Sequence, residues 1–189
     1  MRRPKIKPII ILNEYGTTER DWINPDHIDD IWNRMKNDGI ILPPYKSIHR
    51  KNLNKLDLRI LTGDNGYRIV FKVWNYETNE YDVYDIHFKK GFIWDLATVP
   101  HLFRGIVGND DYIVRVPAMI HDSLYLTHKV SWKVANYIFA CAMVHYDKSR
   151  KRKLYSFGVN TRKAKKGYKS INPTTHWAKD FVEIKVNGK

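Results

Sequence analysis

Polar and apolar residues alternate in the middle of the chain, a pattern typical of strands with one buried face. The first alternating run covers residues 67–74 and places four large apolar residues on one side, Tyr67, Ile69, Phe71 and Val73. A second run covers residues 81–88. Residues 56–61 precede the turn-prone residues 62–66, which predicts a hairpin between 56–61 and 67–74. We therefore expect an antiparallel β-meander of at least three strands here.

Two longer apolar segments, 112–126 and 130–146, follow and are long enough to form helices. Pro117 is expected to begin or kink the first of them, because proline removes a helical N–H donor. Cys141 in the second is expected to be a buried small residue. Strands followed by paired helices predict an α+β fold, with the antiparallel β-meander packed on a helical hairpin.

The first 55 residues are expected to form an N-terminal extension that contains an amphipathic helix over residues 25–38. Asn24 and Pro25 supply a helix start, and Gly39 supplies an end. Apolar residues recur at helical spacing between them, at Ile28, Ile31, Trp32 and Met35. The apolar residues 9–12 predict a short strand ahead of this helix.

Residues 56–147 are expected to form the α+β core, and residues 148–189 a basic C-terminal extension. A helix is expected in the extension up to about residue 167, and a last strand over residues 180–186. The chain has one cysteine, which excludes an intramolecular disulfide. No apolar run approaches the roughly 18–20 residues of a membrane-spanning helix or forms a signal-peptide core, so we expect neither membrane insertion nor export.

Positive charge is concentrated in one stretch of the 189-residue chain. The formal net charge is +13, from 33 Lys and Arg against 20 Asp and Glu. Residues 148–169 hold ten cations and no acid, which leaves 23 cations against 20 acids elsewhere. A surface with this charge can attract nucleic-acid phosphates, anionic lipid or an acidic protein. The alternative is that it is only a solvated basic face. The expected nucleic-acid-binding residues are Lys148, Arg150, Lys151, Arg152, Lys153, Arg162, Lys163, Lys165 and Lys166.

Four polar residues are candidates for chemistry: Asp95, His121, Asp122 and Tyr125. His121 and Asp122 lie in a largely apolar helix, where an unpaired charge is costly. If Asp95 folds back onto His121, its carboxylate orients the imidazole, and the other ring nitrogen is left as base, acid or metal ligand. Tyr125, one turn further on, would then face the same cavity. The alternative is structural: Asp95 caps a helix, and His121 is a core residue with satisfied hydrogen bonds.

The same residues resemble a known signature. Residues 91–100 are G-F-I-W-D-L-A-T-V-P and residues 121–125 are H-D-S-L-Y. The two motifs are similar to those of an uncharacterised family found mainly in bacteriophages and prophages, whose first motif is G-F-x-T-D-x-A-S-V-P. Trp94 and Thr98 depart from that pattern, and Asn136 stands where the family usually has Asp. The resemblance implies a phage origin and no defined reaction.

Two functions from different classes are consistent with these features. The first is a phage-encoded protein with a hydrolase-like site on Asp95 and His121, for which one divalent metal ion is a candidate cofactor. The second is a non-catalytic virion or packaging-associated protein whose basic extensions bind nucleic acid or a neighbouring subunit. Both would place the protein in the host cytoplasm or in the phage particle.

Overall fold

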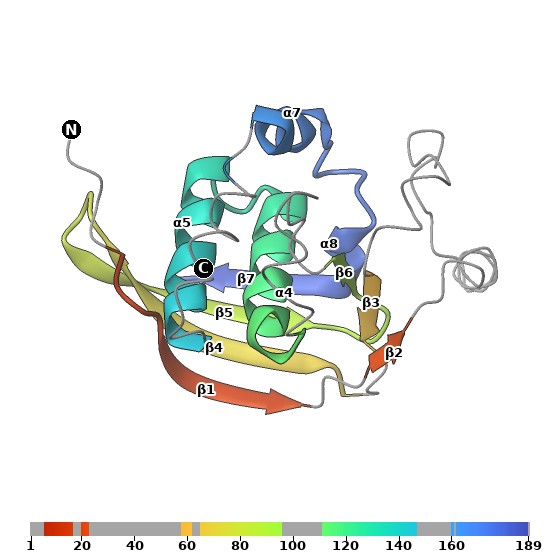
Figure 1. Ribbon diagram of the computed structural model, residues 1–189, viewed down its shortest axis with the longest axis horizontal. Coiled ribbons are helices and arrows are strands. Elements are labelled where there is room, and N and C mark those ends of the chain that lie inside the picture. The colour runs from red at the N-terminus through yellow and green to blue at the C-terminus, as the bar shows by residue number, and fades with distance from the viewer. Residues whose placement is uncertain are drawn as a thin grey trace.

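The computed structural model describes residues 6–16, 20–22, 58–61, 65–95, 111–146, 160 and 162–188. They form a sheet that is covered on one face by a pair of helices (Figure 1). This arrangement confirms the predicted α+β class. The expected helix over residues 25–38 and the basic residues 148–159 lie outside the described part of the chain.

The main sheet has four antiparallel strands in the order β1-β4-β5-β7. Strands β4 and β5 form a hairpin in which Tyr67 pairs with Phe88 and Asn75 pairs with Glu80. Strands β1 and β7 flank this hairpin, β1 beside β4 and β7 beside β5. The sheet therefore combines strands from the predicted N-terminal extension, core and C-terminal extension. The bounds are β1 Ile10–Gly16, β4 Tyr67–Asn75, β5 Glu80–Phe88 and β7 Val182–Val186.

The alternation in the sequence corresponds to the two faces of this sheet. One face is buried, and its residues on β4 and β5 include the four apolar residues expected for β4. The other face is more polar: Nε of Arg68 donates to Oδ1 of Asp85 at 2.7 Å. This contact with the guanidinium lowers the pKa of the Asp85 carboxyl. The buried residues are Tyr67, Ile69, Phe71 and Val73 on β4, and Tyr84, Ile86 and Phe88 on β5.

The predicted hairpin between residues 56–61 and 67–74 is wrong. Strand β3 (Leu58–Leu61) belongs to a second sheet of order β2-β3-β6, where it pairs with β2 (Arg20–Trp22) and β6 (Ile93–Asp95). Both sides of β4 are already hydrogen-bonded, to β1 and β5, so β4 has no edge left for β3. The N–H of Leu61 instead donates to the carbonyl of Phe92 at 2.9 Å.

The helical hairpin is confirmed, as α4 (Asp111–Thr127) and α5 (Trp132–Tyr146). Pro117 lies inside α4 and does not begin it. Cys141 is buried in α5 as expected, and its burial raises the pKa of the thiol to about 11. Apolar side chains of both helices complete the core against the sheet, among them Met119, Ile120, Leu124, Ile138, Phe139 and Met143.

Two further helices follow the hairpin. Helix α7 (Arg162–Ser170) lies across one end of α4 and α5 (Figure 1). It overlaps the predicted basic helical segment and continues three residues past the expected end near residue 167. Helix α8 (Ala178–Phe181) leads directly into β7, so the predicted last strand is confirmed but starts at Val182. None of the helices that the structure describes is both long and apolar enough to cross a membrane.

Candidate functional site

Asp95 is the last residue of β6, whose backbone pairs with Leu58 of β3. Strand β6 packs beside α4, the helix that bears His121. The side chain of Asp95 lies outside the described part of the chain. The contact between Asp95 and His121 therefore stays a prediction.

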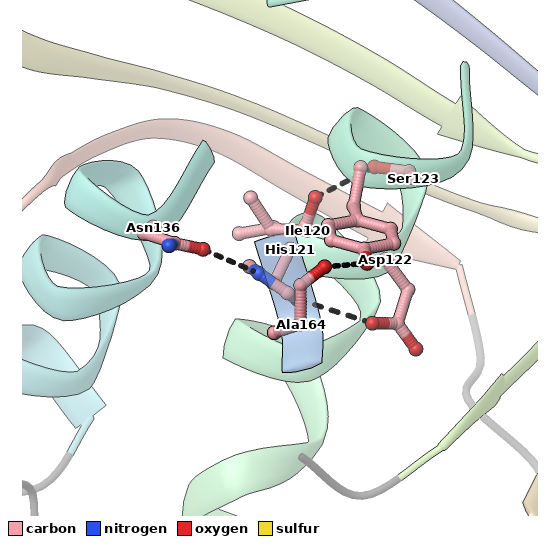
Figure 2. Close-up of polar contacts among 7 residues, drawn as sticks. Ile120, His121, Asp122, Ser123, Asn136 and Ala164 are labelled. Atoms are coloured by element: carbon pink, nitrogen blue, oxygen red, sulfur yellow. Dashed lines mark hydrogen bonds and ion pairs between the residues drawn. The ribbon is translucent and has the colours of Figure 1, made fainter. Parts of the chain in front are cut away.

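His121 lies on the inner side of α4 and is 7% exposed. Its Nε2 is 3.0 Å from Oδ1 of Asn136 on α5, and its Nδ1 is 3.2 Å from Oδ1 of Asp122 (Figure 2). The ring also packs against the edge of Phe139, with centroids 5.2 Å apart. Both ring nitrogens thus face oxygen atoms of the protein, so a carboxylate from Asp95 would have to share one of these positions.

The hydrogen bonding continues from His121 to the surface. Nδ2 of Asn136 donates to Oδ1 of Asn160 at 3.1 Å, and Asn160 is exposed two residues before α7 begins. We call Asp122, His121, Asn136 and Asn160 the polar row. Because it passes from α4 through α5 to the start of α7, it joins three parts of the chain that are distant in sequence.

Tyr125 uses its hydroxyl to hold α7. The hydroxyl donates to the carbonyl of Ala164 at 2.5 Å, while the ring lies 5.4 Å from the ring of His121. Helix α7 approaches closely here: a Cβ on Gly167 would lie 2.9 Å from the Tyr125 hydroxyl. Glycine at this position permits the two helices to meet.

The geometry limits what His121 can do chemically. Because both ring nitrogens already face protein oxygens, a reacting group would have to displace Asp122 or Asn136 to reach either nitrogen. The neighbouring hydroxyl of Ser123 is buried and donates to the carbonyl of Ile120 at 2.8 Å. Within the described residues, no three His, Cys, Asp or Glu side chains gather as metal ligands would.

Helix α7 is also held against the turn that joins α4 and α5. The ring of His128 stacks on Tyr168 with centroids 3.9 Å apart, and its Nε2 is 2.9 Å from the carbonyl of Tyr168. The Tyr168 hydroxyl donates to the carbonyl of Val130 at 2.8 Å. Nζ of Lys165 lies 5.7 Å from the ring centre of Trp132, the first residue of α5.

These contacts bring together lysines from two separate segments. Lys129 follows His128, and Lys169 follows Tyr168; Lys133 follows Trp132, over which Lys165 lies. The exposed lysines of this region, which we call the cationic end, are Lys129, Lys133, Lys165, Lys166 and Lys169.

The sequence holds no acidic residue over 123–146 or 148–179, so the lysines of the cationic end have no acidic neighbour along the chain. Lys165 and Lys166 were expected from the sequence. Lys129 and Lys133 were not, although the acid-free stretch 123–146 is a signal that could have identified them. Arg162 and Lys163 lie in α7, but their side chains are outside the described part of the chain. So are the predicted binding residues Lys148, Arg150, Lys151, Arg152 and Lys153.

His176 lies near the cationic end and is held in its neutral form. The N–H of Ala178 donates to its Nδ1 at 3.2 Å, which requires an unprotonated nitrogen. Burial lowers the pKa of His176 from its ordinary value, and the charge of His128 acts in the same direction. Protonation of this ring therefore opposes the native structure.

Residues 69–159 match the sequence profile of a family described as a protein of unknown function, DUF1353. This domain extends from β4 through α5, includes His121, Asp122 and Asn136, and ends before α7 begins. No curated protein is significantly similar to the chain, and no solved structure is either.

Replacement of Asn136 tests the polar row. Asn136→Leu removes the hydrogen-bond partner of buried His121 and the donor to Asn160, so it should lower the free energy of unfolding by about 1–3 kcal/mol. Asn136→Asp keeps an oxygen next to Nε2 and should retain more stability. Urea unfolding followed by circular dichroism measures both variants. If Asn136→Leu is as stable as the wild type, these hydrogen bonds do not stabilise the fold.

A pH series tests His176. The unfolded chain takes up a proton near the ordinary histidine pKa, and the native ring takes it up only at lower pH. The unfolded state therefore binds more protons in this window, and stability should fall as the pH decreases from about 7 to 5. In His176→Asn the amide oxygen can still accept from Ala178 but does not titrate, so the decrease should be smaller. Equal slopes for both proteins in urea unfolding would contradict this assignment.

Proposed function

We propose that this protein binds nucleic acid through the cationic end, and that the polar row positions α7 for this role. The observation that supports the proposal is the convergence of exposed lysines from the α4–α5 turn, α5 and α7 on one end of the molecule. Closely spaced lysines create a positive potential that attracts phosphate backbones. Residues 148–153, which lie outside the described part of the chain, hold five further cations.

The contacts of the polar row support a positioning role for it. His121 is almost completely buried, and both of its nitrogens contact protein oxygens. A substrate would have to displace Asp122 or Asn136 to reach the ring. The hydrogen bond from Asn136 to Asn160 instead fixes the point from which the chain enters α7.

A hydrolase-like site remains the second candidate, and one observation favours it. His121 and Asp122 are an ionisable pair on a largely apolar helix, and such pairs occur often at catalytic sites. In this proposal Asp95 is the second carboxylate at the ring, and a divalent ion would need ligands in addition to these. An experimental structure that placed the Asp95 carboxylate in an open path to His121 would favour this candidate.

We also propose that the protein is phage-encoded, in the host cytoplasm or in the particle. The support is the pair of motifs at residues 91–100 and 121–125 and their resemblance to the phage family. A packaging-associated role requires the chain to be present in purified particles or to act on DNA as they fill. Mass spectrometry of purified particles should detect it if it is a virion component, and its absence would restrict the proposal to the host cytoplasm.

Removal of three lysines tests the binding proposal. The variant Lys165→Gln, Lys166→Gln, Lys169→Gln should bind mixed-sequence DNA about 10- to 100-fold more weakly at physiological salt, because three phosphate contacts are lost. Fluorescence anisotropy of labelled DNA measures the affinity.

The matched control is Lys72→Gln, Lys89→Gln, Lys185→Gln, which removes the same charge from β4, from the residue after β5 and from β7. It should bind nearly as well as the wild type. If both triple variants lose affinity equally, only net charge matters and the cationic end is not the binding site. If the wild type binds anionic phospholipid vesicles and not DNA, the nucleic-acid proposal is wrong.

A further inference from the structure

The aromatic rings of the cationic end are used within the fold. Tyr168 stacks on His128, contacts the edge of Tyr125 and donates its hydroxyl to a backbone carbonyl. The ring of Trp132 lies beneath the ammonium group of Lys165. Proteins that bind single strands place aromatic rings where successive bases can stack on them. The rings that the structure describes here are already stacked or covered by other groups.

The uncharged polar side chains near this end also form hydrogen bonds with other groups of the protein. Oγ of Ser131 accepts from the N–H of Val134, and the hydroxyl of Ser170 donates to the carbonyl of Gly167. Oδ1 of Asn172 accepts from both the N–H and the hydroxyl of Thr174. Side chains of these types read base edges in sequence-specific complexes. In the described part of this end, the lysine ammonium groups are therefore the main groups presented to a ligand.

The lysines come from two segments of the chain. Lys165 and Lys169 are four residues apart on one side of α7, a rise of about 6 Å along the helix. Lys129 and Lys133 are also four residues apart, on the turn and α5. The His128–Tyr168 stack joins the α4–α5 turn to α7, and the Trp132–Lys165 contact joins the start of α5 to α7, so the lysines of these segments lie at one end of the molecule. Several point charges gathered at one end suit a ligand with a dense, regular array of phosphates.

We infer that the cationic end binds double-helical nucleic acid through its phosphates, with no preference for base sequence. This inference rests on the proposed function and specifies its ligand. A duplex has one negative charge per about 1.7 Å of axis, more than a single strand, and each lysine contact with it releases more counterion. Lysine contacts with phosphate fix a protein on the duplex without reading its sequence.

The experiment compares four probes of equal length with the full chain: an A·T-rich duplex, a G·C-rich duplex and the two corresponding single strands. Fluorescence anisotropy over a salt series gives affinity and salt dependence. We expect the two duplexes to bind within about threefold of each other, and each to bind about tenfold or more tightly than its single strand. The triple variant at 165, 166 and 169 should lower the slope of log K against log salt for the duplex by about 3.

The possible outcomes separate this inference from the proposed function. Lysine-dependent binding that favours single strands would overturn the duplex assignment and leave nucleic-acid binding intact. It would also point to stacking by Tyr155 or Phe157, which lie outside the described residues. A strong preference for one duplex would overturn the absence of sequence reading. No binding to any probe, or no effect of the lysine substitutions, would overturn both proposals.

Discussion

The hydrogen bond between Nε2 of His121 and Oδ1 of Asn136 is the contact on which the arrangement of the helices depends. A polar ring this deeply buried is tolerated only when its nitrogens are paired, because an unsatisfied buried group costs about 1–3 kcal/mol. The partner is on the other helix of the hairpin, so pairing fixes how α4 and α5 lie against each other. Apolar packing alone tolerates several such arrangements, whereas a buried polar pair favours one.

Asn136 also connects the helical hairpin to the chain that enters α7. Asn136 is bonded to Asn160, and the Tyr125 hydroxyl is bonded to the backbone of α7, so the short basic helix is fixed relative to the core. Isolated helices of nine residues are marginal in water, and α7 contains a glycine and no acidic residue to form stabilising pairs. Its stability must come from contacts with the hairpin. The polar row and the cationic end are therefore two parts of one structural unit.

The parts of this structure that sequence reasoning could predict are those with local causes. The alternation of β4 and the apolar lengths of α4 and α5 are visible within single segments. The partner of β3 was not predictable in this way, because it is decided by which distant strands occupy the edges of β4. The contact of His121 with Asn136 follows from the hairpin, since both residues lie at similar distances from the turn at 128–131. The contact of His128 with Tyr168 depends on the return of the chain in α7, which no local pattern indicates.

Lysines gathered at one end of the molecule repel one another, and hydrogen bonds and ring contacts within the fold oppose that repulsion. Tyr168, Tyr125 and His128 hold α7 through backbone carbonyls and ring stacking, which are insensitive to salt, whereas the repulsion is strongest at low salt. A bound polyanion removes the repulsion and leaves the anchoring contacts in place. A ligand that binds only the native arrangement of this end stabilises that arrangement by mass action. Ligand binding therefore favours folding of this end. The clustering of charge that destabilises the free protein is the feature that gives the bound form its affinity.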